Sequence, residues 1–450
     1  MNKYNFPKLK LKRFKMYLVA ISMILILLIL LKLTTKTSLQ LGKVNLLSII
    51  IYRDFGVLTA IALAFWIASP MTNQHYVMSQ IPVQSLKVAL YASFTFMLFV
   101  IFYGYFFKIL FSELSSKMPR VNENYFLSII KLWLLFLSLI MILMYFQNPP
   151  VLTKLFQGAT ALDISIARSE VGGNNFFKIV RNTWVPAASY TMLYFYSRNK
   201  NLIYWLLFSI LLAIICSVWS GAKSMLASLM LGYLGVYIIS KNNIKISNAK
   251  ILFYASIFIA FIIFMYYITT LNTGSTFDII LTTAKYRFFG QAGGVGYAFY
   301  IYPTFMEHKY FTGISSFLSS LSATQFSSVY ADLIDYAVPE FADISGAMSS
   351  FAAGDAYGLF GWWGIIIGPL FVAFFYYLFH YMSIKGNARV LFIGMYGLYF
   401  GNAYLASSFY SFVWPVGMVL SISPMLVFYF LSSIKHQGQV YEKNPFSTTK

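Results

Sequence analysis

The sequence predicts an all-α, polytopic integral membrane protein with about eleven or twelve transmembrane helices and two larger external loops. Hydrophobic residues make up 59% of the 450-residue chain and charged residues only 10%, far from the composition of a soluble domain. Runs of roughly twenty apolar residues recur, which is the length that crosses a bilayer as a helix. A spanning segment must satisfy its own backbone hydrogen bonds, as a helix does. We therefore expect residues 1–450 to form one membrane domain.

Eleven apolar runs account for the expected helices. The first, Met16–Leu33, follows a basic tail but lacks a small-residue cleavage site, so we expect a retained helix. The other spans are expected at Leu46–Ser69, Val88–Phe107, Tyr125–Phe146, Asn182–Ser197, Leu202–Trp219, Ser224–Ser240, Ile251–Thr270, Gly358–Phe379, Val390–Ala406 and Phe412–Leu431.

Lysine and arginine residues in the short loops predict the orientation. Cytoplasmic loops carry an excess of these residues. The four basic segments contain Arg198 and Lys200; Lys241, Lys245 and Lys250; Lys385 and Arg389; and Lys435 and Lys443. Placing them in the cytoplasm puts a first loop, residues 147–181, and a second, large loop, residues 271–357, on the external side.

The amino-terminal half fits this alternation less well. Eleven spans with an internal carboxyl terminus would leave the basic amino-terminal tail outside. The favoured repair splits the second run into two short helices, Leu39–Tyr52 and Asp54–Ser69, around Arg53. This gives twelve spans and two internal termini. The alternative keeps eleven spans and an external tail.

The formal charge of +20 does not indicate nucleic-acid binding, because the basic residues are scattered at helix ends. A single cysteine, Cys216, excludes disulfides and cysteine-based metal sites within one chain. The four histidines are too dispersed to predict a zinc site. No cofactor and no metal are expected.

Seven of the thirteen acidic residues lie in the second loop, between Leu271 and Tyr357. Carboxylates crowded into one loop of a membrane protein indicate a purpose beyond solubility. A loop of this length is also expected to contain short helices against the membrane surface. The first loop carries mixed charge.

Four cations are candidates for binding a phosphate group. Arg168 precedes Gly172 and Gly173, which would let a phosphate approach the backbone; the alternative is an interfacial arginine paired with Glu170 or lipid headgroups. Arg181, at the end of the same loop, is equally compatible with either role.

Lys223 lies at the external start of a helix, where a cation beside the positive end of the helix dipole suits an anion; snorkelling is the alternative. Arg287 precedes a glycine-rich stretch that is explained by close helix packing. Arg287 is the favoured second contact to a diphosphate.

Two carboxylates are the candidate catalytic groups. Asp355 lies between Gly354 and Tyr357 at the start of a span, where no capping need explains it, and it could serve as a general base for a sugar hydroxyl. Asp335 shares a helix face with Asp332 and is the second candidate. Glu340 and Asp343 follow a proline and are expected at a helix start. Tyrosines of the same loop could stack on sugars, although each alone is better explained by the interfacial aromatic belt.

Cations, carboxylates and aromatic residues beside lipid match an amphipathic substrate with a diphosphate, a sugar and an apolar tail. A lipid-linked oligosaccharide has all three. The diphosphate is a good leaving group once cations neutralise it, so glycan transfer would need no nucleotide.

Three segments carry a resemblance to O-antigen polymerases, the Wzy family. SGAMSSFAAGDAYGLFGWWGIIIGPLFVAFFYY, Ser345–Tyr377, is similar to the family's late loop and following helix. The turn Ser220–Lys223 resembles a serine-glycine-small-arginine turn, with a lysine in place of the usual arginine, which weakens a bidentate role for Lys223. YRFFGQ, Tyr286–Gln291, fits the arginine that opens the large loop.

The resemblance implies a GT-C-like architecture and polymerisation of undecaprenyl-diphosphate-linked oligosaccharide repeat units by inverting transfer at the periplasmic face of the bacterial inner membrane. It also implies membrane lipid, a chain-length regulator and a flippase of the same pathway as partners. An O-antigen ligase with the same donor is one alternative. A lipid-linked oligosaccharide flippase is another, but it would place charges within the helices instead of in two loops. A structural or accessory role would leave the loop charges unexplained.

Overall fold

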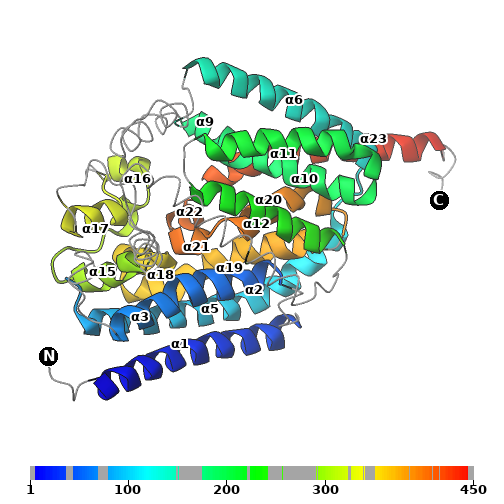
Figure 1. The fold of residues 1–450 in the computed structure, drawn as a ribbon. Coiled ribbons are helices and arrows are strands. Elements are labelled where there is room, and N and C mark those ends of the chain that lie inside the picture. Colours follow the sequence, from blue (N-terminus) through cyan, green and yellow to red (C-terminus); the bar gives the residue numbers. More distant parts are fainter. Residues whose placement is uncertain are drawn as a thin grey trace. The chain divides into compact units, whose positions relative to one another are not determined.

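The structure is a computed structural model of the chain. It describes residues 6–36, 44–68, 80–147, 151, 175–219, 223–241, 256, 290, 292–322, 326–337, 339, 350–384, 386–407, 409–414 and 416–443. Within these residues every element of regular secondary structure is a helix (Figure 1). The all-α prediction is confirmed for this part of the chain.

Seven helical segments of the described residues are long and apolar enough to cross a membrane. They are α1 (Phe6–Thr35), the run of α2 (Leu46–Ile49), η3 (Ile50–Ile61) and α3 (Ala62–Ala68), α5 (Val83–Lys117), α6 (Glu123–Gln147), η5 (Lys200–Leu202) with α11 (Ile203–Val218), α19 (Trp362–Ile384) and α23 (Val416–Lys443). Large apolar side chains such as Leu132 and Phe146 are exposed on them, as expected for surfaces that face lipid. These segments make the chain a multi-pass membrane protein.

The remaining helices are shorter. They are α9 (Asn175–Ile179), η4 (Val180–Trp184), α10 (Val185–Arg198), α12 (Lys223–Ser240), α15 (Gly293–Ile301), η7 (Tyr310–Gly313), α16 (Ser316–Leu321), α17 (Val329–Ala337), α18 (Phe351–Phe360), α20 (Arg389–Gly401), α21 (Tyr404–Ser407) and α22 (Tyr410–Val413). The described part of the second loop therefore contains short helices, as its length predicted.

The expected split around Arg53 is wrong. Residues Leu46–Ala68 form one uninterrupted helical segment. The side chain of Asn45 accepts hydrogen bonds from the backbone amides of Leu47 and Ser48 and so fixes the helix start. Arg53 causes no break, because its Nε lies 2.5 Å from Oδ1 of Asp54 and the two charges neutralise each other within the helix. The side of the membrane on which the amino-terminal tail lies stays a prediction.

Other span boundaries also differ from the prediction. The run predicted from Gly358 is interrupted at Gly361, whose φ of 59° lies in the left-handed region that favours glycine, and α19 begins only at Trp362. The span predicted to end at Ala406 ends as a helix at Gly401. The predicted span Ile251–Thr270 lies outside the described residues, apart from one position.

The chain divides into two compact units. Unit 1 comprises Met1–Phe106, Ile246–Phe375 and Ala403–Trp414, and unit 2 comprises Phe107–Lys245, Tyr376–Asn402 and Pro415–Lys450. In unit 1, α18 packs against α15, α17, α21 and α22. In unit 2, α10, α11, α12 and α20 pack together.

Glycines allow α12 and α20 of unit 2 to approach closely. A Cβ atom on Gly401 would lie 2.1 Å from the carbonyl oxygen of Ser228, and one on Gly235 would lie 2.4 Å from Cγ of Phe400. No side chain fits at such distances. Small residues at helix interfaces are the usual means by which membrane helices associate.

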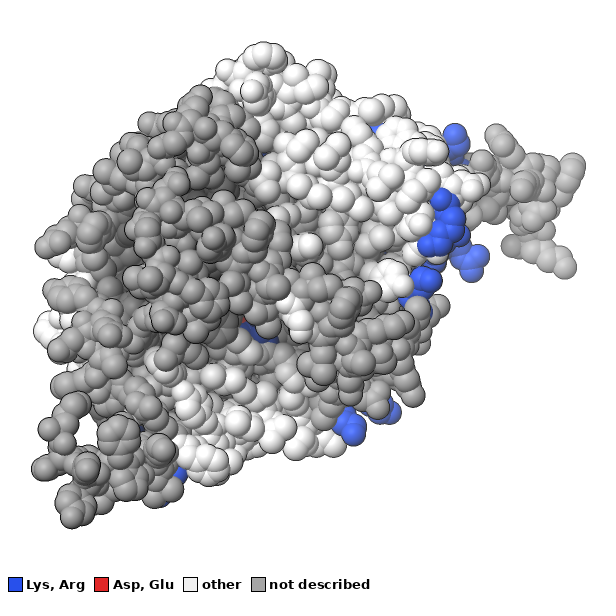
Figure 2. All heavy atoms as spheres, in the orientation of Figure 1, with Lys and Arg blue, Asp and Glu red and all other residues white. Residues whose placement is uncertain are grey.

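Described residues of the four predicted cytoplasmic segments lie at one end of unit 2. Arg198 and Arg389 both lie over the ring of Tyr194, at 4.7 and 5.0 Å from its centroid. Arg389 also donates a hydrogen bond to the carbonyl oxygen of Ile239, at 2.6 Å, so the end of α12 lies at the same place. Figure 2 shows Lys and Arg atoms gathered beside the carboxyl-terminal part of α23. The charge pattern thus correctly grouped segments that are far apart in sequence.

Lys435 of α23 joins this end through Tyr125 of α6, whose ring centroid lies 4.4 Å from Nζ. The neighbouring residue Glu123 pairs with Arg198 at 2.6 Å. We call this group of Arg198, Arg389, Lys435 and their partners the basic end of unit 2.

Candidate functional site

Asp355 lies on α18 of unit 1, with only 2% of its surface exposed. Its Oδ1 accepts a hydrogen bond from the hydroxyl of Ser350, and its Oδ2 accepts one from the backbone amide of Phe409 at 2.9 Å. Both donors are uncharged. A buried carboxylate needs such partners, because burial without them costs several kcal/mol. The two donors also fix the orientation of the carboxylate.

Two glycines explain how α18 reaches this position. A Cβ on Gly354 would lie 3.0 Å from Cα of Val295 in α15, and one on Gly358 would lie 2.8 Å from Cγ1 of Val329 in α17. Larger residues would push both neighbouring helices away from Asp355. The close contact therefore depends on glycine at either side of the acid in the sequence.

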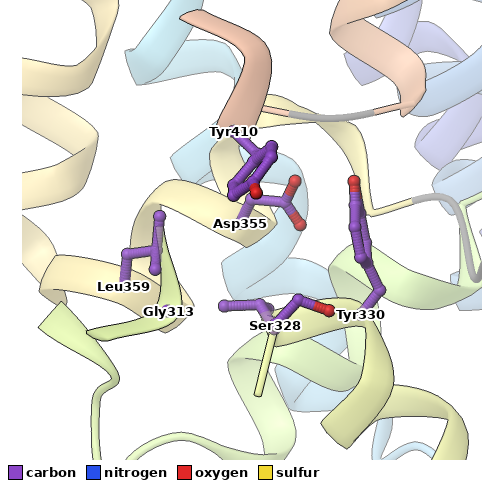
Figure 3. A pocket seen from close by; sticks show the side chains of 7 residues that line it. Gly313, Ser328, Tyr330, Asp355, Leu359 and Tyr410 are labelled. Carbon is purple, nitrogen blue, oxygen red and sulfur yellow. The ribbon is translucent and has the colours of Figure 1, made fainter. Parts of the chain in front are cut away.

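Asp355 also borders a small cavity of ≈ 10 Å³ in unit 1. This is room for about one water molecule. The lining residues are Gly313, Ser328, Val329, Tyr330, Asp355, Leu359 and Tyr410. In Figure 3 the carboxylate of Asp355 points towards the space between the rings of Tyr330 and Tyr410. The carboxylate can therefore accept a hydrogen bond from one small polar group in this space.

A second buried carboxylate, Asp332 of α17, lies in the same unit. Its Oδ2 accepts from the hydroxyl of Tyr302 at 2.6 Å and lies 2.8 Å from Nζ of Lys309, while its Oδ1 accepts from Ser327 at 2.5 Å. Lys309 neutralises the charge, so Asp332 is held in a closed network. Its geometry favours a structural role.

Burial, the hydrogen bond to Asp332 and the charges of Asp332 and Asp355 raise the pKa of Tyr302 well above its ordinary value. Tyr302 therefore remains a neutral hydrogen-bond donor at physiological pH. The ring of His308 stacks on the Tyr302 ring, with centroids 5.8 Å apart, and contacts the ring of Tyr357 edge-on at 5.3 Å. The imidazole of His308 thus adjoins the network around Asp332.

The two acids of α17 differ in their surroundings. Asp335 is exposed, whereas Asp332 is buried. Sequence reasoning favoured Asp335 and missed Asp332. The missed signal was amphipathicity, because Asp332 falls among the buried positions Val329, Leu333 and Ala337 on the apolar face of the helix. Ser350 and the backbone of Phe409 were also missed, since no local pattern relates them to Asp355.

Arg181 is the one predicted cation whose side chain the structure describes. It lies in η4 of unit 2 and is only 6% exposed. Its Nε donates to Oδ1 of the neutral Asn182 at 2.9 Å, and no carboxylate in the described part of the chain pairs with it. Buried charges are normally paired. An anionic ligand would complete this environment.

The other predicted cations cannot be compared in the same way. Lys223 is the first residue of α12, but its side chain lies outside the described residues, as do Arg168 and Arg287 entirely. The structure therefore places Asp355 and Asp335 in unit 1 and Arg181 in unit 2, and leaves the other three as predictions.

Within the described ranges, no three His, Cys, Asp or Glu side chains come close enough to hold a metal ion. Comparisons with protein-family models, curated proteins and solved structures found no match.

Proposed function

We propose that the protein is a glycosyltransferase that polymerises undecaprenyl-diphosphate-linked oligosaccharide repeat units at the external face of the bacterial inner membrane. The observation that supports this best is Asp355, a buried carboxylate that accepts hydrogen bonds from Ser350 and from the backbone amide of Phe409 and lines a cavity with Tyr330 and Tyr410. A carboxylate oriented by hydrogen bonds can accept the proton of an acceptor hydroxyl. The predicted resemblance to O-antigen polymerases and a GT-C-like architecture agree with this chemistry.

The proposed reaction is an inverting transfer. The acceptor hydroxyl oxygen attacks the anomeric carbon of the donor, and its proton passes to Asp355. A new glycosidic bond forms as the bond between the anomeric carbon and the diphosphate oxygen breaks, and undecaprenyl diphosphate leaves. Asp335 is the second candidate base, on an exposed position that the solvent reaches.

Four cations are assigned to the donor diphosphate: Arg168, Arg287, Lys223 and Arg181. Their charge would stabilise the leaving group as its negative charge develops. Arg181 supports this assignment, because a buried guanidinium whose described hydrogen-bond partner is neutral is suited to an anion. The predicted partners are membrane lipid, a chain-length regulator and a flippase of the same pathway, with no nucleic acid.

The test is the length of the surface glycan in a strain that lacks the chromosomal copy. We expect the wild-type chain to restore long glycans and Asp355→Asn to yield single-repeat material at equal membrane abundance. The matched control is Glu307→Gln, an exposed acid of the same loop, which should restore long glycans.

Other outcomes would replace the proposal. Long glycans made by Asp355→Asn would remove this residue from the active site. In the deletion strain itself, free lipid-linked polymer would indicate an O-antigen ligase, and lipid-linked intermediate trapped on the cytoplasmic side would indicate a flippase.

A further inference from the structure

An exposed apolar surface lies on residues Tyr310–Ser322 of unit 1, which comprise η7 and α16. Phe311 is 65% exposed, Phe317 59% and Leu321 70%. The segment contains no charged residue. Phe317 and Leu321 lie four residues apart and so share one face of α16. We call these three side chains, Phe311, Phe317 and Leu321, the apolar face of the segment.

Internal hydrogen bonds hold the apolar face outward. The hydroxyl of Ser319 donates to the carbonyl oxygen of Thr312 at 2.5 Å, and the hydroxyl of Ser315 accepts from the backbone amide of Leu318 at 3.1 Å. The backbone amide of Lys309 donates to the carbonyl oxygen of Gly358 in α18 at 3.1 Å. The backbone of the segment is therefore held against unit 1 with these side chains exposed.

Ring contacts tie the apolar face to the starts of two spans. The ring of Phe311 lies 5.4 Å from that of Phe360, two residues before Trp362, the first residue of α19. The ring of Phe317 stacks on Trp414 at 6.4 Å, two residues before the start of α23. Both helices are long and apolar enough to cross a membrane.

Tryptophans mark the depth of this region. Trp362 and Trp363 are 55% and 69% exposed at the first turn of α19. Tryptophan at the end of a transmembrane helix typically lies at the level of the lipid headgroups. The exposed residues Ile366 and Ile367 continue the same surface along the span. The contact between Phe311 and Phe360 places the apolar face beside the start of this exposed surface.

We propose that Tyr310–Ser322 docks in the headgroup layer of the bilayer, with Phe311, Phe317 and Leu321 inserted among the lipids. The segment has no charge, so insertion is driven by apolar burial and does not require anionic lipid. On the proposed function, this docking holds Lys309, Asp332 and Asp355 near the depth at which the diphosphate of a lipid-linked substrate lies.

Site-directed spin labelling tests the docking without any catalytic readout. Single cysteines replace Phe317 or Leu321 in a Cys216→Ala background, with Glu307→Cys as the matched water-facing control, and the labelled proteins are reconstituted in phosphatidylcholine vesicles. We expect labels at 317 and 321 to collide several-fold more often with oxygen, which concentrates in lipid, than with a water-soluble nickel chelate. The control should show the reverse, and anionic phosphatidylglycerol should leave both ratios unchanged.

Two outcomes would overturn the docking. Frequent collision with the nickel chelate at 317 and 321 would mean that the face lies in water. Low collision rates with both reagents, accompanied by spin–spin broadening, would mean that a second copy of the chain covers it. These collision ratios are measured without substrate, so they test the docking independently of the polymerase activity.

Discussion

Among the described residues, buried carboxylates occur in unit 1 and not in unit 2. In unit 1 the carboxylates of Asp332 and Asp355 are buried and fully oriented by hydrogen bonds. In unit 2 the two acids whose side chains are described, Glu113 and Glu123, are exposed and pair with bases across the surface. Burying a carboxylate costs free energy, and buried, oriented carboxylates are typical of functional sites. Exposed pairs contribute little to stability.

The cations of unit 2 divide in a corresponding way. Arg198, Arg389 and Lys435 lie at the basic end, as expected for cations on the cytoplasmic side of a membrane. Arg181 is buried instead. A count of charges therefore cannot separate those that orient the chain from those that serve a site, whereas burial and partners can.

The largest effect is expected for the sidedness of the two units' loops. If the basic end of unit 2 is cytoplasmic and the second loop is external, Lys200→Cys should resist a membrane-impermeant maleimide in intact spheroplasts, whereas Glu307→Cys should react completely. With the second span uninterrupted, Asn5→Cys should react as well. The measurement is labelling in a Cys216→Ala background before and after permeabilisation. Reaction of Lys200→Cys from outside would invert the assignment.

Asp332→Ala should strongly destabilise unit 1. The change leaves Lys309 without its partner and two hydroxyls without their acceptor, and breaking a buried pair costs roughly 3–5 kcal/mol. Denaturant unfolding in detergent micelles measures this free energy. Asp335→Ala, on the exposed side of the same helix, should change it by no more than about 0.5 kcal/mol. Equal effects of the two changes would show that the network around Asp332 is not what stabilises α17.

Stability should also fall at high pH because of Tyr302. Its folded-state pKa is raised above its ordinary value of 10.0 by burial and by Asp332. Above that pH the unfolded chain loses the proton and the folded protein keeps it, so the free energy of unfolding decreases by up to about 1.4 kcal/mol per pH unit. Below it this contribution is constant.

The comparison for this effect is Tyr302→Phe, which has no proton to lose. Between neutral pH and pH 11 the free energy of unfolding should decrease more steeply for the wild type than for this variant. Equal slopes would mean that Tyr302 titrates normally in the folded protein.

The smallest effect is expected at the basic end. Glu123→Ala removes an exposed pair with Arg198, in which both side chains are nearly half exposed, so the loss should be less than about 1 kcal/mol and should vanish at high salt. The free energy of unfolding at low and high ionic strength measures it. A loss of several kcal/mol that persists at high salt would show that this exposed pair stabilises the protein as much as the buried network around Asp332 does.

Much of the fold was predictable from hydropathy and charge. Helices follow the apolar runs, since lipid forces the backbone to satisfy its own hydrogen bonds. The basic segments were correctly grouped at one end, because the rule depends on composition alone. Reliance on composition also explains the wrong split predicted at Arg53. A charged residue in an apolar run suggests a break in the helix, unless its neighbour, here Asp54, is recognised as its ion-pair partner.

The candidate site was predictable only in part. Asp355 was identified from its glycine-flanked position, and it is the acid that lines the cavity. The buried member of the pair on α17 was misjudged, because spacing places Asp332 and Asp335 on one face without showing which of them meets a neighbouring helix.

Hydropathy along the chain was enough to predict the membrane class and most of the helices, and charge was enough to group the basic segments. Which carboxylates are buried, and which donors hold them, became visible only in the folded chain. Phe409 reaches Asp355 across 54 residues and Tyr302 reaches Asp332 across 30, distances that no helical period encodes. Such pairs exist only once the short helices have packed, and packing depends on glycines such as Gly358 that leave no mark on a hydropathy profile.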